Sequence, residues 1–125
     1  MRPSISIAVA GLLCLNGGAV AQPKDTSANS VFPGCKAYAG GLATNAQSPL
    51  THAANYCSGV VHGLAYVGKI VPAEYQSCAP PTSDRRELAR VVVKYIEERP
   101  QRMHEDFRKL VLEAFHNAWP CKAGQ

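Results

Sequence analysis

Charged residues are scarce in this chain of 125 residues. Asp, Glu, Lys and Arg supply 18% of it, below the average of about 25% for globular proteins. Hydrophobic residues supply 46%, which is close to the usual share. This balance argues against a disordered chain and against a coiled coil. The length allows one domain at most, because the chain could not fill a second core.

Long apolar runs are also few. The first extends from Ile5 to Leu15 and is too short for a membrane-spanning helix, which needs about 20 residues. Arg2 precedes this run, and the small-x-small triplet at residues 19–21 (Ala-Val-Ala) follows it. A charged start, an apolar core and a small-x-small exit are typical of a secretory signal peptide. We expect cleavage of residues 1–21, after Ala21, and export of a bacterial protein to the periplasm or the cell exterior.

Cleavage changes the cysteine count and the charge. It removes Cys14 from a total of 5 cysteines. Leu13 stands before Cys14, where a lipid-modified cysteine would follow a small residue, so we do not expect a lipoprotein. The cut also lowers the net charge of +4 by one. The remaining basic residues are spread along the chain, which argues against nucleic-acid binding.

Four cysteines remain after cleavage. They are Cys35, Cys57, Cys78 and Cys121. In an oxidising compartment, an even set of cysteines in a domain of this size predicts two disulfides. Four cysteines allow three alternative pairings.

The start of the mature chain contains few apolar residues. Residues 22–31 are therefore expected to form a flexible N-terminal arm, with Val31 and Phe32 as its first contacts with the core. A short helix is expected over residues 34–39, directly after Pro33.

Apolar residues at spacings of three and four predict a long helix from about residue 50 to residue 70. This helix contains three glycines, Gly59, Gly63 and Gly68. Each would weaken an isolated helix by about 1 kcal/mol relative to Ala. They therefore indicate the close approach of another helix backbone or a local break. Loops are predicted on either side, over residues 40–49 and 71–82.

Two helices of similar length follow. The first has Ser83 or Thr82 as its cap, carries Asp84 in its first turn, and stops at Pro100. The second shows apolar periodicity from Met103 to Ala118. Their short connection makes them antiparallel neighbours. The sequence predicts an all-α fold, a small disulfide-stapled bundle of about four helices that ends in an antiparallel helix hairpin.

This hairpin favours one of the three disulfide pairings. Cys78 lies just before its first helix and Cys121 just after its second, so folding brings these two cysteines together. The remaining pair is Cys35 with Cys57. In the chain-entropy model, each bond would stabilise the fold by about 3–4 kcal/mol.

Motifs for catalysis or metal binding are missing. The chain has no Cys-x-x-Cys, His-Glu-x-x-His, Gly-x-Ser-x-Gly or phosphate-binding glycine loop. No two of its histidines are closely spaced: they are His52, His62, His104 and His116. The acidic pairs at residues 97–98 and 105–106 are sequence neighbours, which on a helix do not point together. We predict no metal site, no cofactor and no enzymatic activity.

Four spaced segments carry a resemblance to a known family. They are Tyr56-Cys57-x-Gly59-x-x-x-Gly63, Cys78-Ala79-Pro80, Val91-Val92-Val93-Lys94-Tyr95-Ile96-x-x-x-Pro100, and Leu110-Val111-x-x-Ala114-Phe115-x-x-Ala118-Trp119-Pro120-Cys121. In this arrangement the chain resembles the Rap/Tai type of periplasmic immunity protein, which protects bacteria against peptidoglycan amidases delivered by type VI secretion. The resemblance covers about residues 32–121 and leaves residues 122–125 as a C-terminal tail.

The resemblance implies a non-catalytic periplasmic protein that binds and neutralises such an amidase. Similar proteins often form homodimers and inhibit by pushing a loop into the active-site groove of the effector. Residues 40–49 and 71–82 are the candidate loops, with Glu74, Tyr75 and Gln76 as contacts. A disulfide-stiffened scaffold suits this role, because its loop has little ordering entropy left to lose on binding. The alternative is a general periplasmic chaperone, resembling small acid-stress chaperones and switched by its histidines as the pH falls.

Overall fold

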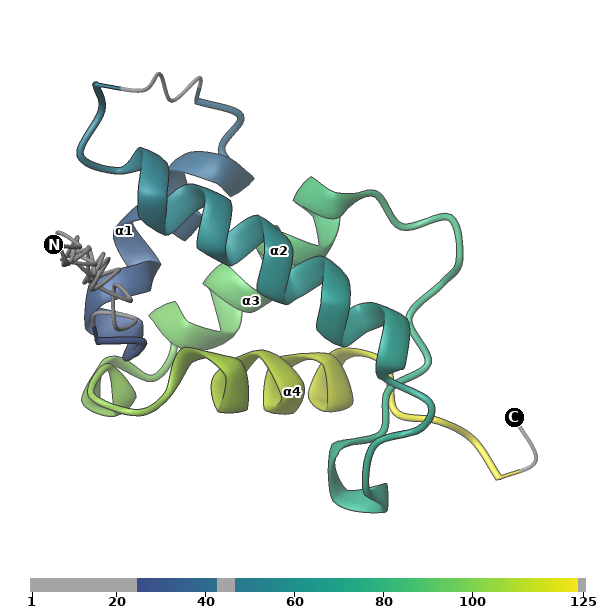
Figure 1. The fold of residues 1–125 in the computed structure, drawn as a ribbon. Helices are drawn as coiled ribbons and strands as arrows, with labels where there is room; N and C mark the ends of the chain where they lie inside the picture. Colours follow the sequence, from purple (N-terminus) through teal and green to yellow (C-terminus); the bar gives the residue numbers. More distant parts are fainter. Residues whose placement is uncertain (1–24, 43–46, 124–125) are drawn as a thin grey trace, which may run out of the picture.

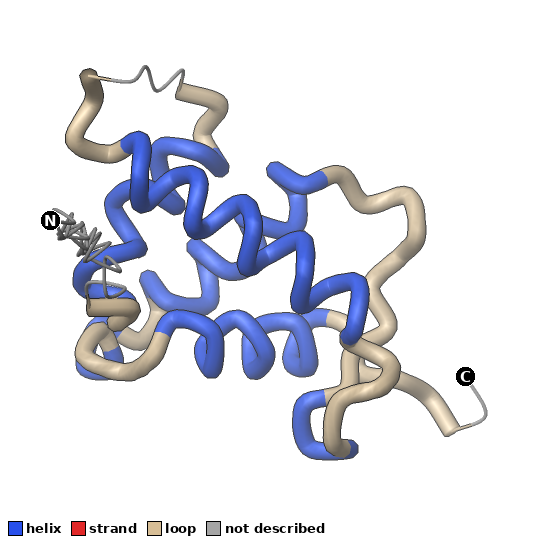
Figure 2. The backbone as a smooth tube through the Cα atoms, viewed as in Figure 1, coloured by secondary structure: helices blue, strands red, loops and turns tan. Residues whose placement is uncertain are grey.

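The computed structural model describes residues 25–42 and 47–123. The α-helices of this part are α1 (Ala28–Ala39), α2 (Thr51–Val67), α3 (Arg85–Glu97) and α4 (Phe107–Ala118). Two short 3-10 helices, η1 (Ala73–Tyr75) and η2 (Pro100–Arg102), lie in the connections. The described residues form no strand (Figure 2). The prediction of an all-α bundle is confirmed, whereas the predicted signal peptide lies outside the described residues.

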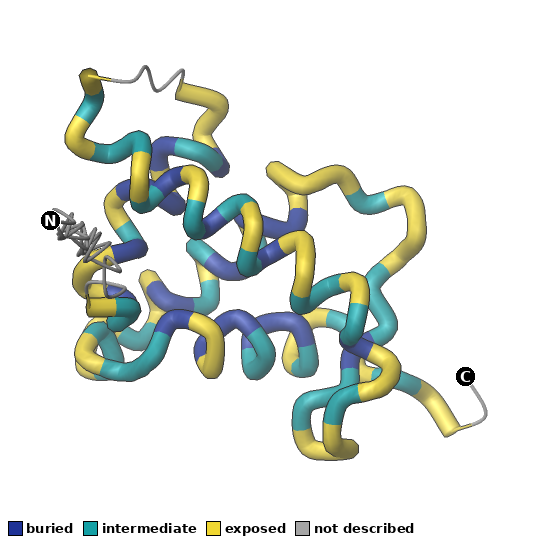
Figure 3. The backbone as a smooth tube through the Cα atoms, in the orientation of Figure 1, coloured by how far each residue is buried: buried dark blue, intermediate teal, exposed yellow. Residues whose placement is uncertain are grey.

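The four helices meet around one core (Figure 1). Helix α2 packs against the other three, and α4 runs back in the direction opposite to α3. The largest fully buried side chains come mainly from the last two helices and include Ile96, Phe107, Leu110 and Phe115. Buried residues lie in the middle of the bundle, and exposed residues lie on its outside (Figure 3). In the part of the chain that the structure describes, no helix is long and apolar enough to cross a membrane.

Helix α1 begins six residues earlier than the sequence suggested. Residues 28–31, which we expected in the flexible arm, form its first turn, and Pro33 lies inside the helix. Two backbone bonds hold this turn in place: Ala28 N donates to Glu105 O at 2.9 Å, and Asn29 N donates to Met103 O at 2.8 Å. Tertiary hydrogen bonds and the burial of Ala28 therefore outweigh the cost of an interior proline.

A close approach between helix backbones does occur, but at a different glycine from those expected. A Cβ atom at Gly34 of α1 would lie 2.5 Å from both the Ala53 Cβ and the Ala54 N of α2. Gly59 and Gly63, in contrast, have open space at this position, so the expected close approach is wrong for these two. Helix α2 ends at Val67, three residues before the predicted end.

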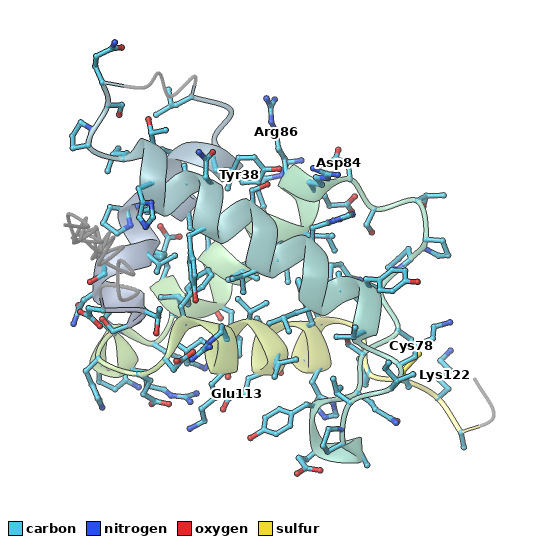
Figure 4. All side chains as sticks on the ribbon, in the orientation of Figure 1. Tyr38, Cys78, Asp84, Arg86, Glu113 and Lys122 are labelled. Atoms are coloured by element: carbon cyan, nitrogen blue, oxygen red, sulfur yellow. A yellow bond between two sulfur atoms is a disulfide. The ribbon has the colours of Figure 1, made fainter. Side chains whose placement is uncertain are left out.

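Helix α3 is capped by a different residue from those expected. The Asp84 side chain, and not that of Ser83 or Thr82, accepts hydrogen bonds from the backbone N–H groups of Arg86 and Glu87, each at 2.8 Å. These bonds hold the pKa of the Asp84 carboxyl below its usual value. Asp84 and Arg86 are labelled at the start of α3 in Figure 4.

The last helix is shorter than its apolar pattern. Helix α4 starts at Phe107, with Asp106 as its N-cap, although the periodicity began at Met103. Met103 packs against the core from outside the helix, between η2 and α4. An apolar residue at helical spacing can therefore be buried without being helical, which is why the boundary was misplaced.

Both favoured disulfides are present. Cys35 of α1 is bonded to Cys57 of α2, and Cys78 is bonded to Cys121. The first bond joins α1 to α2 next to their close contact at Gly34. The second joins the segment before α3 to the segment after α4, as the hairpin geometry predicted.

Candidate functional site

A loop projects from one end of the bundle between α2 and α3 (Figure 1). We call residues 68–78 the η1 loop. Its base is closed by a bond from Ser77 N to Gly68 O at 2.9 Å. Gly68 has to be small, because a Cβ atom there would lie 2.5 Å from the Ser77 Oγ. Glycine at the end of α2 thus allows the last residues of the loop to pack against its first residue.

The C-terminal end of α4 holds this loop in place. Cys78 N donates to Trp119 O at 2.8 Å, and Ser77 forms an antiparallel bridge with Pro120. His116 Nδ1 lies 2.7 Å from the Gln76 carbonyl oxygen. The disulfide from Cys78 adds a covalent link to the same region. Hydrogen bonds and a disulfide therefore restrain the η1 loop, although it projects from the bundle.

The three predicted contact residues lie together at the turn of this loop. Glu74 is exposed, while Tyr75 and Gln76 are half-buried. Gln76 has a structural part, because its side-chain Nε2 donates to Lys69 O at 3.3 Å and its carbonyl oxygen contacts His116. Glu74 and Tyr75 are thus the better candidates for direct contact with a partner.

Two large exposed apolar side chains, one just before the loop and one in its first residues, were missed by the sequence reasoning. Tyr66 is 88% exposed and Ile70 is 82% exposed. They lie four residues apart, where α2 ends and the loop begins. Apolar residues out of register with the buried stripe were the signal that could have found them. Tyr66 also lines a groove of about 220 Å³ whose other wall includes Pro80 and Pro81.

The second candidate loop, residues 40–49, can be assessed only in part, since residues 43–46 lie outside the described ranges. Leu42 is 68% exposed. Gly41 adopts a positive φ of 74°, and its surroundings include the Arg86 guanidinium. Leu42 N donates to Ala37 O at 3.0 Å, which holds the start of this loop against the end of α1.

The histidines do not gather into a site. His52, His62 and His104 are exposed, and His116 bonds to the η1 loop. No group of three or more His, Cys, Asp or Glu residues that could hold a metal ion occurs in residues 25–42 and 47–123. The placement of the histidines gives no support to the alternative of a pH-switched chaperone.

The main cluster of charges is half-buried and links η2 to the last two helices. Arg102 donates to Glu105 Oε1 at 2.6 Å and to Glu113 Oε2 at 2.6 Å. Tyr95 OH donates to the same Glu113 oxygen at 3.0 Å. Bonds from Arg102 and Lys109 lower the pKa of Glu105 to about 2. These bonds join η2 to α3 and α4, so the acidic residues are ion-pair partners rather than a catalytic pair.

Comparison with known proteins identifies the chain. A family model described as Rap1a immunity proteins matches residues 17–121. Neither the curated proteins nor the solved structures gave a match. The matched region includes both disulfides and the whole η1 loop. The chain therefore belongs to the family of Rap1a immunity proteins, as its cysteine frame and closing Trp-Pro-Cys suggested.

Proposed function

We propose that this protein binds and neutralises a peptidoglycan amidase effector of type VI secretion. Its family consists of immunity proteins, which implies a non-catalytic role and binding to a protein effector. The amidase as target rests on the resemblance to the Rap/Tai type. In this proposal the η1 loop enters the active-site groove of the amidase and blocks it.

The anchored η1 loop is the observation that supports this proposal. A flexible loop would lose conformational entropy on binding, whereas one already held at its base by hydrogen bonds and a disulfide loses less. Tyr75 is suited to a central contact, because Tyr is enriched among residues that dominate binding energy. Glu74 gives the tip a negative charge.

Exposed apolar side chains at the start of the loop support the same proposal. Tyr66 is exposed on the last turn of α2, and Ile70 is exposed in the first residues of the loop. Large exposed apolar side chains that lie together are typical of protein-binding surfaces. In the proposed complex they would contact the rim of the groove while the turn of the loop, with Tyr75, occupies its centre.

Capture of the partner and protection of cell wall test the proposal. The tagged protein would be used to capture proteins from a periplasmic extract, and any amidase found would be assayed on peptidoglycan with and without it. We expect inhibition, and an affinity about 30-fold lower for Tyr75→Ala, which corresponds to a hot spot of about 2 kcal/mol. Gln101→Ala, an exposed change in η2, is the matched control and should inhibit normally.

Two results would count against this function. One is the failure to capture an amidase, and the other is an amidase whose activity the protein leaves unchanged. Equal inhibition by Tyr75→Ala and the unaltered protein would keep the function but reject the η1 loop as the inhibitory element.

We also propose export to the periplasm and cleavage after Ala21. Both disulfides support an oxidising compartment, since such bonds are rare in the bacterial cytosol. Cell fractionation with N-terminal sequencing should find a periplasmic product that starts at Gln22. A product that keeps Met1 and stays in the cytoplasm would contradict this proposal.

A homodimer is a further proposal that follows from the resemblance alone. Light scattering coupled to size exclusion should then give twice the mass of one mature chain. A monomer at all concentrations tested would contradict it.

A further inference from the structure

The two disulfides lie in very different surroundings. Cys35 and Cys57 are both 0% exposed and belong to the core between α1 and α2. Cys78 and Cys121 are only half-buried, at the junction of the η1 loop with the chain beyond α4. Cys78 is labelled near Lys122 at the edge of the molecule in Figure 4. One bond is thus buried in the core, and the other joins two residues that are partly exposed to solvent.

We propose that the Cys78–Cys121 disulfide is a site of thiol–disulfide exchange with a dithiol oxidoreductase, which releases or locks the η1 loop while the helices stay folded. In the reducing direction, a thiolate of the oxidoreductase attacks one sulfur and forms a mixed disulfide. The other sulfur leaves as a thiolate and takes a proton from water.

The second thiol of the oxidoreductase completes the reaction. Its thiolate attacks the mixed disulfide and frees the second cysteine, which is protonated in turn. Two electrons have then passed from the dithiol to the protein, and the oxidoreductase has become a disulfide. The reverse sequence forms the bond again from an oxidised partner.

The two disulfides differ in how easily an attacking thiolate can reach their sulfur atoms. An attacking thiolate can approach the half-buried pair without movement of any helix. The core pair is reached only after α1 and α2 separate, which breaks the contact at Gly34 and exposes Val61. Openings of this size are sub-global or global unfolding events and are rare in the native state.

Release of the bond acts on the loop and leaves the helices intact. Cys78 lies before α3 and Cys121 after α4, and neither is among the core residues. The non-covalent anchors that remain include the His116 contact, the Ser77 bridge and the bond from Cys78 N to Trp119 O. Reduction should therefore loosen the loop. The effect on an amidase rests on the proposed function, whereas the exchange reaction does not.

Stepwise reduction tests the site directly. The purified oxidised full chain would be treated with N-ethylmaleimide to block free thiols, then with dithiothreitol, and the new thiols would be trapped with a second label and mapped by mass spectrometry. We expect Cys78 and Cys121 to be labelled faster than Cys35 and Cys57 by at least about tenfold. Equal rates, or earlier labelling of the core pair, would overturn the proposal.

Two measurements on the partly reduced protein test the release of the loop. Far-UV circular dichroism should show unchanged helix content, and trypsin should cut after Lys69 several times faster than in the oxidised protein. Loss of helix content, or an unchanged rate of cleavage, would overturn the proposal. The double variant C78S/C121S should match the partly reduced protein in both. If that variant does not fold, the bond is needed for the bundle itself, which also overturns the proposal.

Discussion

A single imidazole joins the projecting loop to the last helix. His116 Nδ1 faces the carbonyl oxygen of Gln76 at 2.7 Å. A carbonyl oxygen can only accept, so the hydrogen bond requires the proton on Nδ1 of the ring. Neutral histidine in this tautomer and protonated histidine both supply that proton. The imidazole therefore anchors the loop as a hydrogen-bond donor at Nδ1.

Replacement of His116 should loosen the loop selectively. His116→Ala removes the donor, and we expect the Ser77 amide, which closes the base of the loop, to exchange with solvent about fivefold faster. His116→Asn is the matched control, because its side-chain NH₂ group can occupy the position of Nδ1–H. Hydrogen exchange measured by NMR distinguishes the two. Equal exchange rates in both variants would show that the hydrogen bond is not what restrains the loop.

A second single-residue effect occurs at the start of α3. Asp84→Ala removes the acceptor for two backbone N–H groups, and we expect the thermal midpoint to fall by about 5 °C. Ser83→Ala, one position earlier, should change it little. Thermal unfolding followed by circular dichroism gives both values. A larger loss from Ser83→Ala would mean that the cap had been assigned to the wrong residue.

The caps show what local sequence rules can and cannot locate. Thr82, Ser83 and Asp84 are all good N-cap residues, so composition alone allowed any of them. The choice among them depends on where the chain after Pro81 meets the core through Leu88 and Ala89. Residues distant in the sequence determine that packing, so the apolar pattern predicted the helix but not the residue at which it begins.

Helix α1 illustrates the same limit at the scale of an element. Its sequence contains an interior proline, and the stretch before Val31 holds few apolar residues; both argue against a helix from Ala28. The turn before α4 supplies backbone acceptors at Met103 and Glu105, about 75 residues later in the chain. No rule based on neighbouring residues can anticipate such bonds. Periodicity succeeded for α2, α3 and α4, whose amphipathic faces carry the information locally.

The contact between α1 and α2 predicts opposite effects for two glycine substitutions. Gly34→Ala places a methyl group within 2.5 Å of the α2 backbone, and we expect a loss of about 2–3 kcal/mol in the free energy of unfolding. Gly59→Ala fills open space on the exposed side of α2 and should raise it by up to about 1 kcal/mol. Urea unfolding measures both. A neutral Gly34→Ala would show that the two helices can separate at no cost.

Ion pairs make the stability of the whole molecule depend on pH in the acid range. Bonds from Arg102 and Lys109 lower the pKa of Glu105 to about 2, and bonds from Arg108 lower that of Asp106 to about 2. The pKa of Glu113 is lowered by the same Arg102. Because the folded pKa values lie below those of the unfolded chain, the unfolded chain binds protons first. The stabilisation is complete above about pH 4.5 and is lost as the pH falls toward 2.

Urea midpoints measured between pH 7 and pH 2 test this response. We expect a plateau down to about pH 4.5 and a steady decline below it, with each carboxyl changing the folding constant by up to about tenfold per pH unit. Glu105→Gln, which cannot titrate, should make the decline shallower. Glu87→Gln, an exposed change on α3, is the control. An identical acid response for the unaltered protein and Glu105→Gln would refute the role of this ion pair.

At the scale of the molecule, spacing along the sequence predicted how distant segments come together, while the role of the η1 loop stays a prediction. The cysteine pairing, the hairpin and the loop after α2 all followed from spacing. The exposure of Tyr66 and Ile70 did not follow from spacing, because apolar periodicity identifies the buried face of a helix and not apolar residues outside that face. The bond between His116 and Gln76 was also out of reach, since it joins a side chain to a backbone carbonyl oxygen, which no sequence motif marks.

The order of the cysteines along the chain has a consequence for how the protein matures. Each disulfide joins cysteines that are consecutive in the sequence, Cys35 with Cys57 and Cys78 with Cys121. In the proposed export, the chain crosses the membrane with its N-terminus first and exposes the first pair before the second. Oxidation in order of arrival then produces the native bonds. Of the three pairings that four cysteines allow, this is the one that requires no later isomerisation.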